Sequence, residues 1–557
     1  MSDINKLLVV DYLESLKEDK ELDAIFPTVL DIAGYEIIST PKDSKGQSQY
    51  GRDVIAIKEV DGVMTRFYFE LKGGSDRNIT DQVLTKDDGV IASIRASKYT
   101  PYTNSAIPGF NDFPIKYVLV HNGTLKENAR PTLEGFIETE KLQGQFERWD
   151  ISKLATLFSD NLFNEYLLTD DGNVALFKKT LVLLDVPEYD LTHLHQLVQK
   201  LCEKTKPHNE RYVQKFLSSL SLIGVMIYHY CKAFNDLDKA KASIDFIVLK
   251  SWSWILENDL EEKPFAKTGF RTILVTQLII YHEYIGKTGP IAKSPDGLFQ
   301  ERGGPYEEIA YSLRCSDFLN MMIYSFRLDE YFDPAQDGKI LIKLLMEIVN
   351  NNSSGLPRPL LDNQGVAYLN VFIYLQQKSG VLDTKEFQRK FLDSLFENIC
   401  IIKNVRKRLP ELHSKKAVLI EYVANAERPF NYDDASSTLI LMLFEMTVIL
   451  DAPDIYNHYR EYFTNTKVDL QTFHPLKDDK TELRLFEKEI TEDGWSETSI
   501  KLPEQYSDFV QLVKKSHCDT FTYRTDAAGF GHLKYLAHGF YKTPFFPGDW
   551  RGFIKRD

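Results

Sequence analysis

The chain has little cysteine and no long apolar run. Its five cysteines are scattered along 557 residues without a Cys-x-x-Cys pair, which argues against a disulfide framework or a zinc ribbon and favours a reducing cytoplasm. No stretch reaches the roughly 18 consecutive apolar residues of a membrane-spanning helix. The first residues also lack the basic and apolar regions of a signal peptide. We therefore expect a cytoplasmic protein without a membrane partner.

Two cofactor motifs are incomplete. Gly286-Lys287-Thr288 matches the end of a phosphate-binding P-loop, but Tyr281 stands where the first glycine of that loop is needed. His282-Glu283 lacks the second histidine of the His-Glu-x-x-His zinc motif. The sequence therefore predicts no nucleotide-driven motor, and it favours a structural role for His282.

Positive charge is scarce as well. The chain has a net charge of −14, and residues 1–168 hold 19 Lys and Arg against 27 Asp and Glu, a net charge of −8. A domain that binds DNA unaided usually has a basic face, so we expect cleavage of nucleic acid to depend on a protein activator, a partner subunit or self-association. Residues 51–100 are balanced, with eight charges of each sign, and their basic side chains would line one substrate groove: Arg52, Arg66, Arg77, Lys86, Arg95 and Lys98.

A predicted hairpin between Gly51 and Gly74 organises the N-terminal part. Apolar runs at 53–57 and 66–71 flank Asp61-Gly62, a strong hairpin signal because glycine adopts positive φ easily. Side chains alternate between the faces of a strand, so Glu70 and Lys72 share one face, and Asp53 can lie across from them. This pattern outlines a site for a metal ion and a water molecule.

Asp53, followed by Glu70-Leu71-Lys72, resembles the Asp…Glu-x-Lys core of the PD-(D/E)XK restriction-endonuclease-like superfamily. Arg52 stands where many members have proline. The flanking pattern also follows the family order αβββαβ, an α/β fold with a mixed sheet, over roughly the first 165 residues. The expected flanking elements are a helix at 22–33, a strand at 34–38, a helix at 79–96, a strand at 115–121, a helix at 131–141 and a strand and helix at 146–157.

The resemblance implies a Mg²⁺- or Mn²⁺-dependent endonuclease. Asp53, Glu70 and the carbonyl of Leu71 would bind the metal, because Mg²⁺ prefers oxygen ligands. Lys72 would orient the attacking water, and Gln82 would assist it. DNA is the favoured substrate over RNA, and similar architectures suggest a gated effector of bacterial anti-phage defence.

Two further groups of residues have roles that follow from the resemblance or its chemistry. Many members use a glutamate from the first helix; Glu14, Glu18 and Glu21 are candidates, and we favour Glu21 as the auxiliary residue. Arg52, Arg77 and Lys86 are the predicted substrate-binding residues.

A less specific interpretation remains open. A carboxylate and a lysine on a solvated strand also form ordinary cross-strand ion pairs. The alternative function is therefore a non-catalytic interaction or scaffold subunit with a degenerate nuclease fold. Loss of metal binding at Asp53 and Glu70 would distinguish this alternative from an active enzyme.

The rest of the chain predicts a large, mainly helical region. Apolar residues at helical spacing dominate residues 169–472, and we expect a scaffold or sensor there. Residues 473–557 end in a segment rich in aromatic residues and glycine. We favour packing of this segment on the helices over an exposed recognition surface, because aromatic side chains are usually buried.

Overall fold

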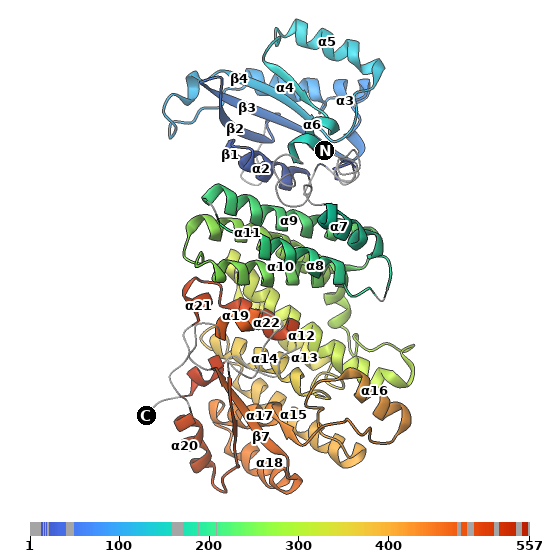
Figure 1. Cartoon of the computed structure of the whole chain (residues 1–557), viewed down its shortest axis with the longest axis vertical. Coiled ribbons are helices and arrows are strands. Elements are labelled where there is room, and N and C mark those ends of the chain that lie inside the picture. The colour runs from blue at the N-terminus through green and yellow to red at the C-terminus, as the bar shows by residue number, and fades with distance from the viewer. Residues whose placement is uncertain are drawn as a thin grey trace. The chain divides into compact units, whose positions relative to one another are not determined.

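In the computed structural model, the chain divides into two compact units, Met1–Tyr230 and Cys231–Asp557 (Figure 1). The expected domain boundary near residue 168 lies outside the described residues. Among the described helices, none is long and apolar enough to cross a membrane. The structure describes residues 10, 13–14, 16, 18, 22–40, 50–158, 171–187, 189–207, 209–475, 481–486, 495–516, 523–541 and 548–554.

The first unit contains a five-stranded mixed sheet, as expected. Its spatial order is β1-β2-β3-β4-β5. The β1–β2 and β2–β3 pairs are antiparallel, and the β3–β4 and β4–β5 pairs are parallel. The strands are β1 (Glu36–Ser39), β2 (Val54–Val60), β3 (Val63–Lys72), β4 (Ile115–His121) and β5 (Phe146–Trp149).

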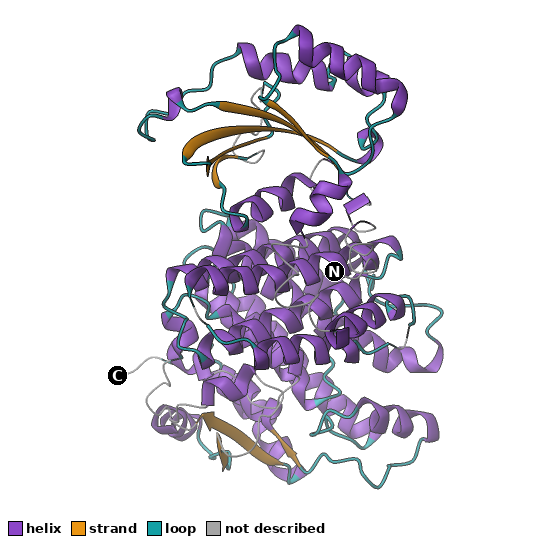
Figure 2. Cartoon of the chain, turned by 45° about the horizontal axis from the view of Figure 1, so that its top comes forward, coloured by secondary structure: helices purple, strands orange, loops and turns teal. Residues whose placement is uncertain are grey.

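Helices cover both faces of this sheet (Figure 2). On one face, Phe26 of α2 packs edge-on against Phe69 at a ring distance of 5.3 Å. On the other face, Tyr68 belongs to an apolar cluster that includes Ile94 of α4 and Phe136 of α5. The helices of this part are α2 (Asp23–Ile32), α3 (Asp81–Thr85), α4 (Val90–Tyr99), α5 (Arg130–Thr139) and α6 (Ile151–Phe158).

One expected helix is wrong in its extent. The sequence predicted a continuous helix at 79–96, but the structure has α3 and α4 with a turn between them. Lys86 ends α3 in an extended conformation, with ψ near 158°. Gly89 then starts α4, and a Cβ there would lie 2.7–2.8 Å from the carbonyl oxygens of Val83 and Lys86. Only glycine fits this close approach.

The remaining helices of the first unit are α7 (Asp171–Leu183), α8 (Thr192–Lys204) and most of α9 (Glu210–Ala233), which crosses the division between the units.

The second unit is mainly helical, as expected, and contains a small three-stranded sheet in the order β6-β7-β8. Its strands are β6 (Ser436–Ser437), β7 (Asp469–Pro475) and β8 (Trp495–Ser499). Its helices are α10 (Leu237–Glu257), α11 (Pro264–Ala292), α12 (Glu307–Phe332), α13 (Gly338–Asn351), α14 (Gly365–Gln377), α15 (Lys385–Arg406), α16 (Lys416–Asn425), α17 (Thr438–Ile449), α18 (Pro453–Thr466), α19 (Thr481–Phe486), α20 (Tyr506–Ser516), α21 (Arg524–Ala527) and α22 (His532–Tyr541).

The described part of the C-terminal segment packs on these helices. The indole of Trp252 on α10 donates a hydrogen bond to Thr525 at 2.9 Å and contacts the ring of Phe530 at 4.7 Å. The indole of Trp550 donates to Glu445 of α17 at 2.6 Å. The aromatic residues of this segment therefore serve as internal anchors.

Candidate metal and catalytic site

The β2–β3 hairpin places the central acidic residues. Asp61 and Gly62 form the turn with φ values of 50° and 81°, the positive-φ pair that joins two antiparallel strands tightly. Val54 pairs with Phe69, and the N–H of Asp53 donates to the carbonyl of Phe69 at 2.9 Å. Asp53 thus lies at the end of the β2–β3 pairing that is close to Glu70 and Lys72 of β3, as the sequence predicted.

Parallel pairing with β4 buries this end of β3. Glu70 lies beside Leu119 and Lys72 beside His121 in the register of the two strands. As a result, Glu70 is only 4% exposed and Lys72 only 7% exposed. These are low exposures for charged side chains. Glu70 and Lys72 are therefore not an ordinary ion pair on a solvated strand face, which was the less specific interpretation.

Each of the three predicted side chains makes a specific contact within the site. Oε1 of Glu70 lies 2.9 Å from Nζ of Lys72. Oδ2 of Asp53 accepts a hydrogen bond from the backbone N–H of Leu71 at 2.7 Å. The backbone of Leu71 is therefore part of the site, while the role of its carbonyl as a metal ligand stays a prediction.

A fourth charged residue, Glu18, joins this group from the N-terminal region. Its carboxylate lies 3.5 Å from Nζ of Lys72 and accepts the N–H of Gly73 at 3.2 Å. Glu18 is one of the three glutamates that the sequence offers for this role; Glu21, the favoured candidate, lies outside the described residues. Sequence spacing could not single out Glu18, because its position depends on how distant backbone segments dock.

Two side chains hold the backbone around Glu18 in place. The side-chain amide of Asn122, directly after β4, donates to the carbonyls of Leu13 and Leu16 at 2.6 and 2.8 Å. The guanidinium of Arg77 donates to the carbonyl of Glu14 at 2.5 Å. Asn122 is completely buried. Its amide adds a second hydrogen bond to the carbonyls of Leu13 and Leu16, which also accept the N–H groups of Leu16 at 3.2 Å and Gly74 at 3.3 Å, respectively.

The electrostatics of the site reflect an excess of negative charge. Burial raises the pKa of Asp53 well above its usual range, and the nearby Glu70 raises it further. Burial likewise raises the pKa of Glu18. Burial opposes the charge on Lys72, but Glu70 and Glu18 outweigh this effect and raise its pKa above the ordinary value. With all groups ionised, the three carboxylates and the one ammonium sum to a local charge of −2.

This donor set fits a hard divalent cation in its chemistry. Mg²⁺ and Mn²⁺ are held by carboxylate and carbonyl oxygens, and the uncompensated charge near Asp53 and Glu70 would be neutralised by such an ion. Within the described residues, no three His, Cys, Asp or Glu side chains already converge as a formed metal cage. Instead, Lys72 supplies the positive charge between Glu70 and Glu18.

The other predicted site residues have different surroundings. Gln82 is exposed on α3, and its side chain has no hydrogen bond to Asp53, Glu70 or Lys72 among the described contacts. Lys86 pairs with Asp76 at 2.6 Å.

Arg52 is held internally. It is only 7% exposed, it donates to the carbonyl of Thr100 at 2.7 Å, and its guanidinium lies over the rings of Tyr68 and Tyr102. These contacts favour a packing role for Arg52 over the predicted contact with substrate.

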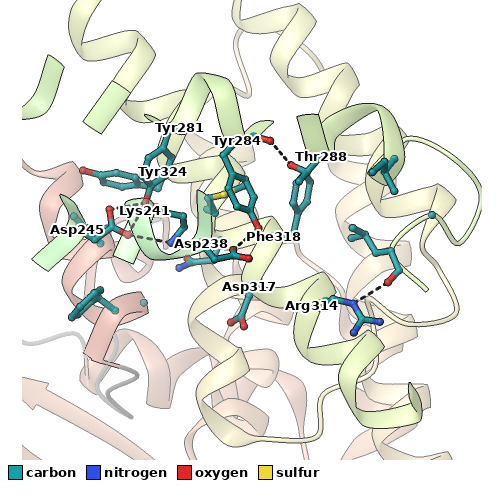
Figure 3. A pocket seen from close by; sticks show the side chains of 18 of the residues that line it. Asp238, Lys241, Asp245, Tyr281, Tyr284, Thr288, Arg314, Asp317, Phe318 and Tyr324 are labelled. Carbon is teal, nitrogen blue, oxygen red and sulfur yellow. Dashed lines mark hydrogen bonds and ion pairs between the residues drawn. The ribbon is translucent and has the colours of Figure 1, made fainter. Parts of the chain in front are cut away.

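The second unit contains a separate cavity of about 640 Å³ between α10, α11, α12 and α22 (Figure 3). Its floor carries the buried carboxylate of Asp245, which accepts hydrogen bonds from Gln277 and Tyr281 and pairs with Lys241 at 3.1 Å. Tyr284 at the wall donates to Asp238 at 2.8 Å. These pairs satisfy one another, so the cavity gives no comparable indication of catalysis.

No protein-family model matches the chain, and comparisons with curated proteins and with solved structures returned no match. Functional interpretation therefore depends on the residues of the site.

Proposed function

We propose that the N-terminal unit is a metal-dependent nuclease that hydrolyses phosphodiester bonds. One observation carries the proposal: Glu70 and Glu18 pair with the ammonium of Lys72 at a buried strand end, and the carboxylate of Asp53 accepts the adjacent N–H of Leu71. Burial of so much like charge is unfavourable for stability alone. A requirement for a bound cation would explain why these carboxylates are buried close together.

The residues would divide the work as follows. Asp53 and Glu70 offer oxygen ligands to Mg²⁺ or Mn²⁺, which when bound neutralises phosphate charge and lowers the pKa of a coordinated water. Lys72, held by Glu70 at 2.9 Å, remains protonated, and it would orient the attacking water and offset the charge that develops on the phosphate. Glu18 lies 3.5 Å from Nζ of Lys72 and would provide a further carboxylate near the metal.

DNA is the favoured substrate, with RNA as the alternative polymer. The net charge of −8 over residues 1–168 opposes unaided binding of a polyanion. We therefore propose that a protein partner, self-association or an activating event gates the activity. A role in anti-phage defence rests on the family resemblance alone.

The test is a cleavage assay on supercoiled plasmid, linear duplex and RNA in Mg²⁺ or Mn²⁺. Wild type would be compared with Asp53→Ala, with Lys72→Ala and with Lys116→Ala, a control that removes a lysine from the neighbouring strand β4. Because Lys72 acts on the attacking water, its loss should reduce the rate by about 10²–10⁴-fold. Asp53→Ala should abolish metal-dependent cleavage, and the control should retain it.

Cleavage that survives in both site variants would contradict the assignment. If no form cleaves any polymer, calorimetric titration with Mn²⁺ decides between two explanations. Binding that Asp53→Ala abolishes would support a gated enzyme, whereas wild type without binding would support the degenerate scaffold.

A further inference from the structure

The cavity of the second unit has the size and the lining of a binding site for a small molecule. Its volume is about 640 Å³, within the range of roughly 300–1,000 Å³ that is typical of ligand sites. Aromatic side chains from three helices line it: Tyr281, Tyr284, Phe318, Tyr324 and Phe540. Aromatic walls with a few polar groups favour an organic ligand over a bare ion.

The floor of the cavity is closed by internal hydrogen bonds. Asp245 accepts the amide of Gln277 at 2.7 Å and the hydroxyl of Tyr281 at 3.0 Å. The oxygen of the Gln277 amide in turn accepts the hydroxyl of Tyr324 at 2.9 Å. Lys241 lies 3.1 Å from the carboxylate of Asp245, so the two charges at the floor cancel. A ligand therefore finds its ionic partner elsewhere in the cavity.

The wall around Tyr284 carries negative charge (Figure 3). Asp238 of α10 is exposed and accepts the hydroxyl of Tyr284 at 2.8 Å, but no cation among the described residues pairs with it. Asp317 of α12 is also exposed and lines the same cavity. Burial raises the pKa of Tyr284, and the charges of Asp238 and Asp317 raise it further. Both carboxylates are therefore close enough to act on this ring.

The second cation of the lining, Arg314, has its own partners. Its Nε donates to the carbonyl of Leu298 at 3.1 Å, and its Nη2 forms an ion pair with the buried carboxylate of Glu307. Each cation of the lining is thus matched by a carboxylate, Lys241 by Asp245 and Arg314 by Glu307. The charge that remains for a ligand is negative.

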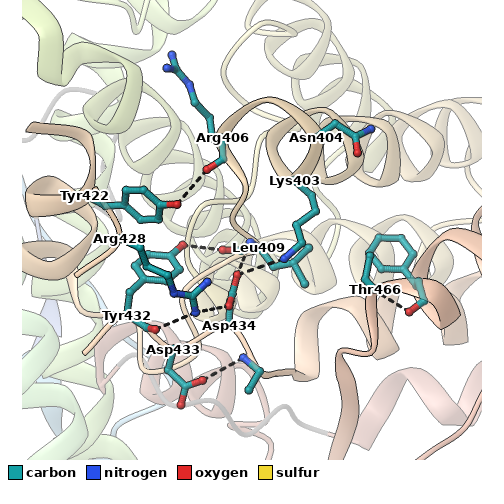
Figure 4. Close-up of polar contacts among 12 residues, drawn as sticks. Lys403, Asn404, Arg406, Leu409, Tyr422, Arg428, Tyr432, Asp433, Asp434 and Thr466 are labelled. Carbon is teal, nitrogen blue, oxygen red and sulfur yellow. Dashed lines mark hydrogen bonds and ion pairs between the residues drawn. The ribbon is translucent and has the colours of Figure 1, made fainter. Parts of the chain in front are cut away.

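Another carboxylate of the second unit shows how Asp238 differs. Asp434 is buried and accepts the guanidinium of Arg428 at 2.6 Å (Figure 4). It also accepts the N–H of Leu409 at 2.8 Å and lies 3.7 Å from the ammonium of Lys403. Two cations therefore balance Asp434 within the protein. Asp238 has no such cation, and its charge is available to a ligand.

We propose that this cavity binds an organic cation, namely a protonated amine attached to an aromatic or other apolar body. The ammonium pairs with Asp238 beside the ring of Tyr284, and the apolar body lies against Phe318 and Phe540. A cation is attracted both by a carboxylate and by the face of an aromatic ring, and the wall offers the two together. The proposal is independent of the nuclease activity, because its residues all lie in the second unit and binding needs neither metal nor nucleic acid.

The test is a titration of the full chain in EDTA, followed by saturation-transfer NMR of the probe. Phenethylamine, 2-phenylethanol and 3-phenylpropionate have similar bodies and are cationic, neutral and anionic at neutral pH. We expect the amine to bind at least about tenfold more tightly than the alcohol, because a charge-assisted hydrogen bond is much stronger than a neutral one. Equal affinity for amine and alcohol, tighter binding of the anion, or no saturable binding of the amine would each overturn the proposal.

One pair of variants tests the carboxylate. Asp238→Asn removes the charge and keeps the shape of the side chain. Glu461→Gln removes one negative charge at an exposed position of α18, outside the lining of the cavity. Affinity for phenethylamine should fall at least about tenfold in Asp238→Asn, which loses the charged partner, and stay at the wild-type value in the control. Equal affinity for the two variants would overturn the proposal.

A second pair tests the aromatic wall. Tyr284→Phe keeps the ring, whereas Tyr284→Leu removes it. We expect the leucine variant to bind phenethylamine about two- to fivefold more weakly than the phenylalanine variant, the usual effect of losing a cation–ring contact. Equal affinity for these two variants would overturn the placement of the ammonium beside Tyr284.

Discussion

The carboxylate of Glu18 lies 3.5 Å from the ammonium of Lys72, although 54 residues separate them in sequence. The same carboxylate accepts the N–H of Gly73 at 3.2 Å. Glu18 therefore touches both the side chain and the backbone at the end of β3, where Asp53 and Glu70 meet. This contact links the N-terminal region to the candidate metal site.

The first prediction concerns Glu18 itself. Glu18→Gln should weaken Mn²⁺ binding about 10- to 100-fold, the usual effect of losing a group that supports the ligands of a metal. Isothermal titration calorimetry measures the affinity, and the plasmid assay measures the accompanying loss of rate. Glu14→Gln is the matched control, because the structure ties Glu14 to Arg77 through its backbone carbonyl. Equal metal affinity for the two variants would remove Glu18 from the site.

The second prediction concerns the docking of this region by Asn122. Asn122→Leu preserves the approximate size of the side chain but removes both hydrogen bonds to the carbonyls of Leu13 and Leu16. Each carbonyl keeps one backbone donor, the N–H of Leu16 on Leu13 and the N–H of Gly74 on Leu16. The loss of two buried hydrogen bonds should therefore lower the free energy of unfolding by about 1–3 kcal/mol. Amide hydrogen exchange around Leu13 and Leu16 should accelerate without any metal present.

Asn128→Leu, at an exposed position of the same unit, should leave both quantities unchanged. Slow exchange around Leu13 in Asn122→Leu would show that other contacts hold the region in place.

The sequence predicted the local part of this site, but it could not choose among Glu14, Glu18 and Glu21 for the part that depends on docking. The β2–β3 hairpin carries its own signals, namely alternating apolar residues and Asp61-Gly62, and so Asp53, Glu70 and Lys72 could be placed from the sequence. Glu18 comes close to them only after distant carbonyls meet the amide of Asn122. The spacing of apolar residues along the sequence does not predict such a long-range contact.

Two other expectations, the continuous helix at 79–96 and the role of Arg52, also depend on contacts between separate parts of the chain. The expected helix at 79–96 is interrupted because Gly89 allows a close backbone approach that local apolar spacing does not reveal. Arg52 has the charge expected of a phosphate contact, but its stacking on Tyr68 and Tyr102 requires side chains from separate elements.

The third prediction separates packing from substrate contact at Arg52. Arg52→Met should lower the free energy of unfolding by about 1–3 kcal/mol, because it removes the hydrogen bond to Thr100 and the contacts with two rings. Chemical denaturation measures this loss. At a temperature where the variant is fully folded, KM for plasmid should match that of wild type. A large rise in KM without a loss of stability would restore the substrate-binding role.

The fourth prediction is a pH dependence of stability that originates at Glu140. Its carboxylate accepts hydrogen bonds from Arg95 and Tyr99, both at 2.8 Å, and from Lys98 at 3.2 Å. The hydrogen bond from Arg95 is the largest influence, and together these contacts lower the pKa of Glu140 to about 2. Because the folded-state pKa lies below the unfolded value, the stabilisation is present above about pH 4.5 and is lost as the pH falls toward 2.

Glu140→Gln should therefore lower the free energy of unfolding by about 1–2 kcal/mol at neutral pH, an amount reduced by solvent around the half-exposed Arg95. The difference between wild type and variant should shrink below pH 4 and vanish near pH 2. Urea denaturation at a series of pH values measures it. The lowered pKa of His121, near 4, also makes stability fall with acid, but it is common to both proteins and cancels in the difference. A difference that stays constant from pH 7 to pH 2 would show that the Glu140 contacts act through packing and not through charge.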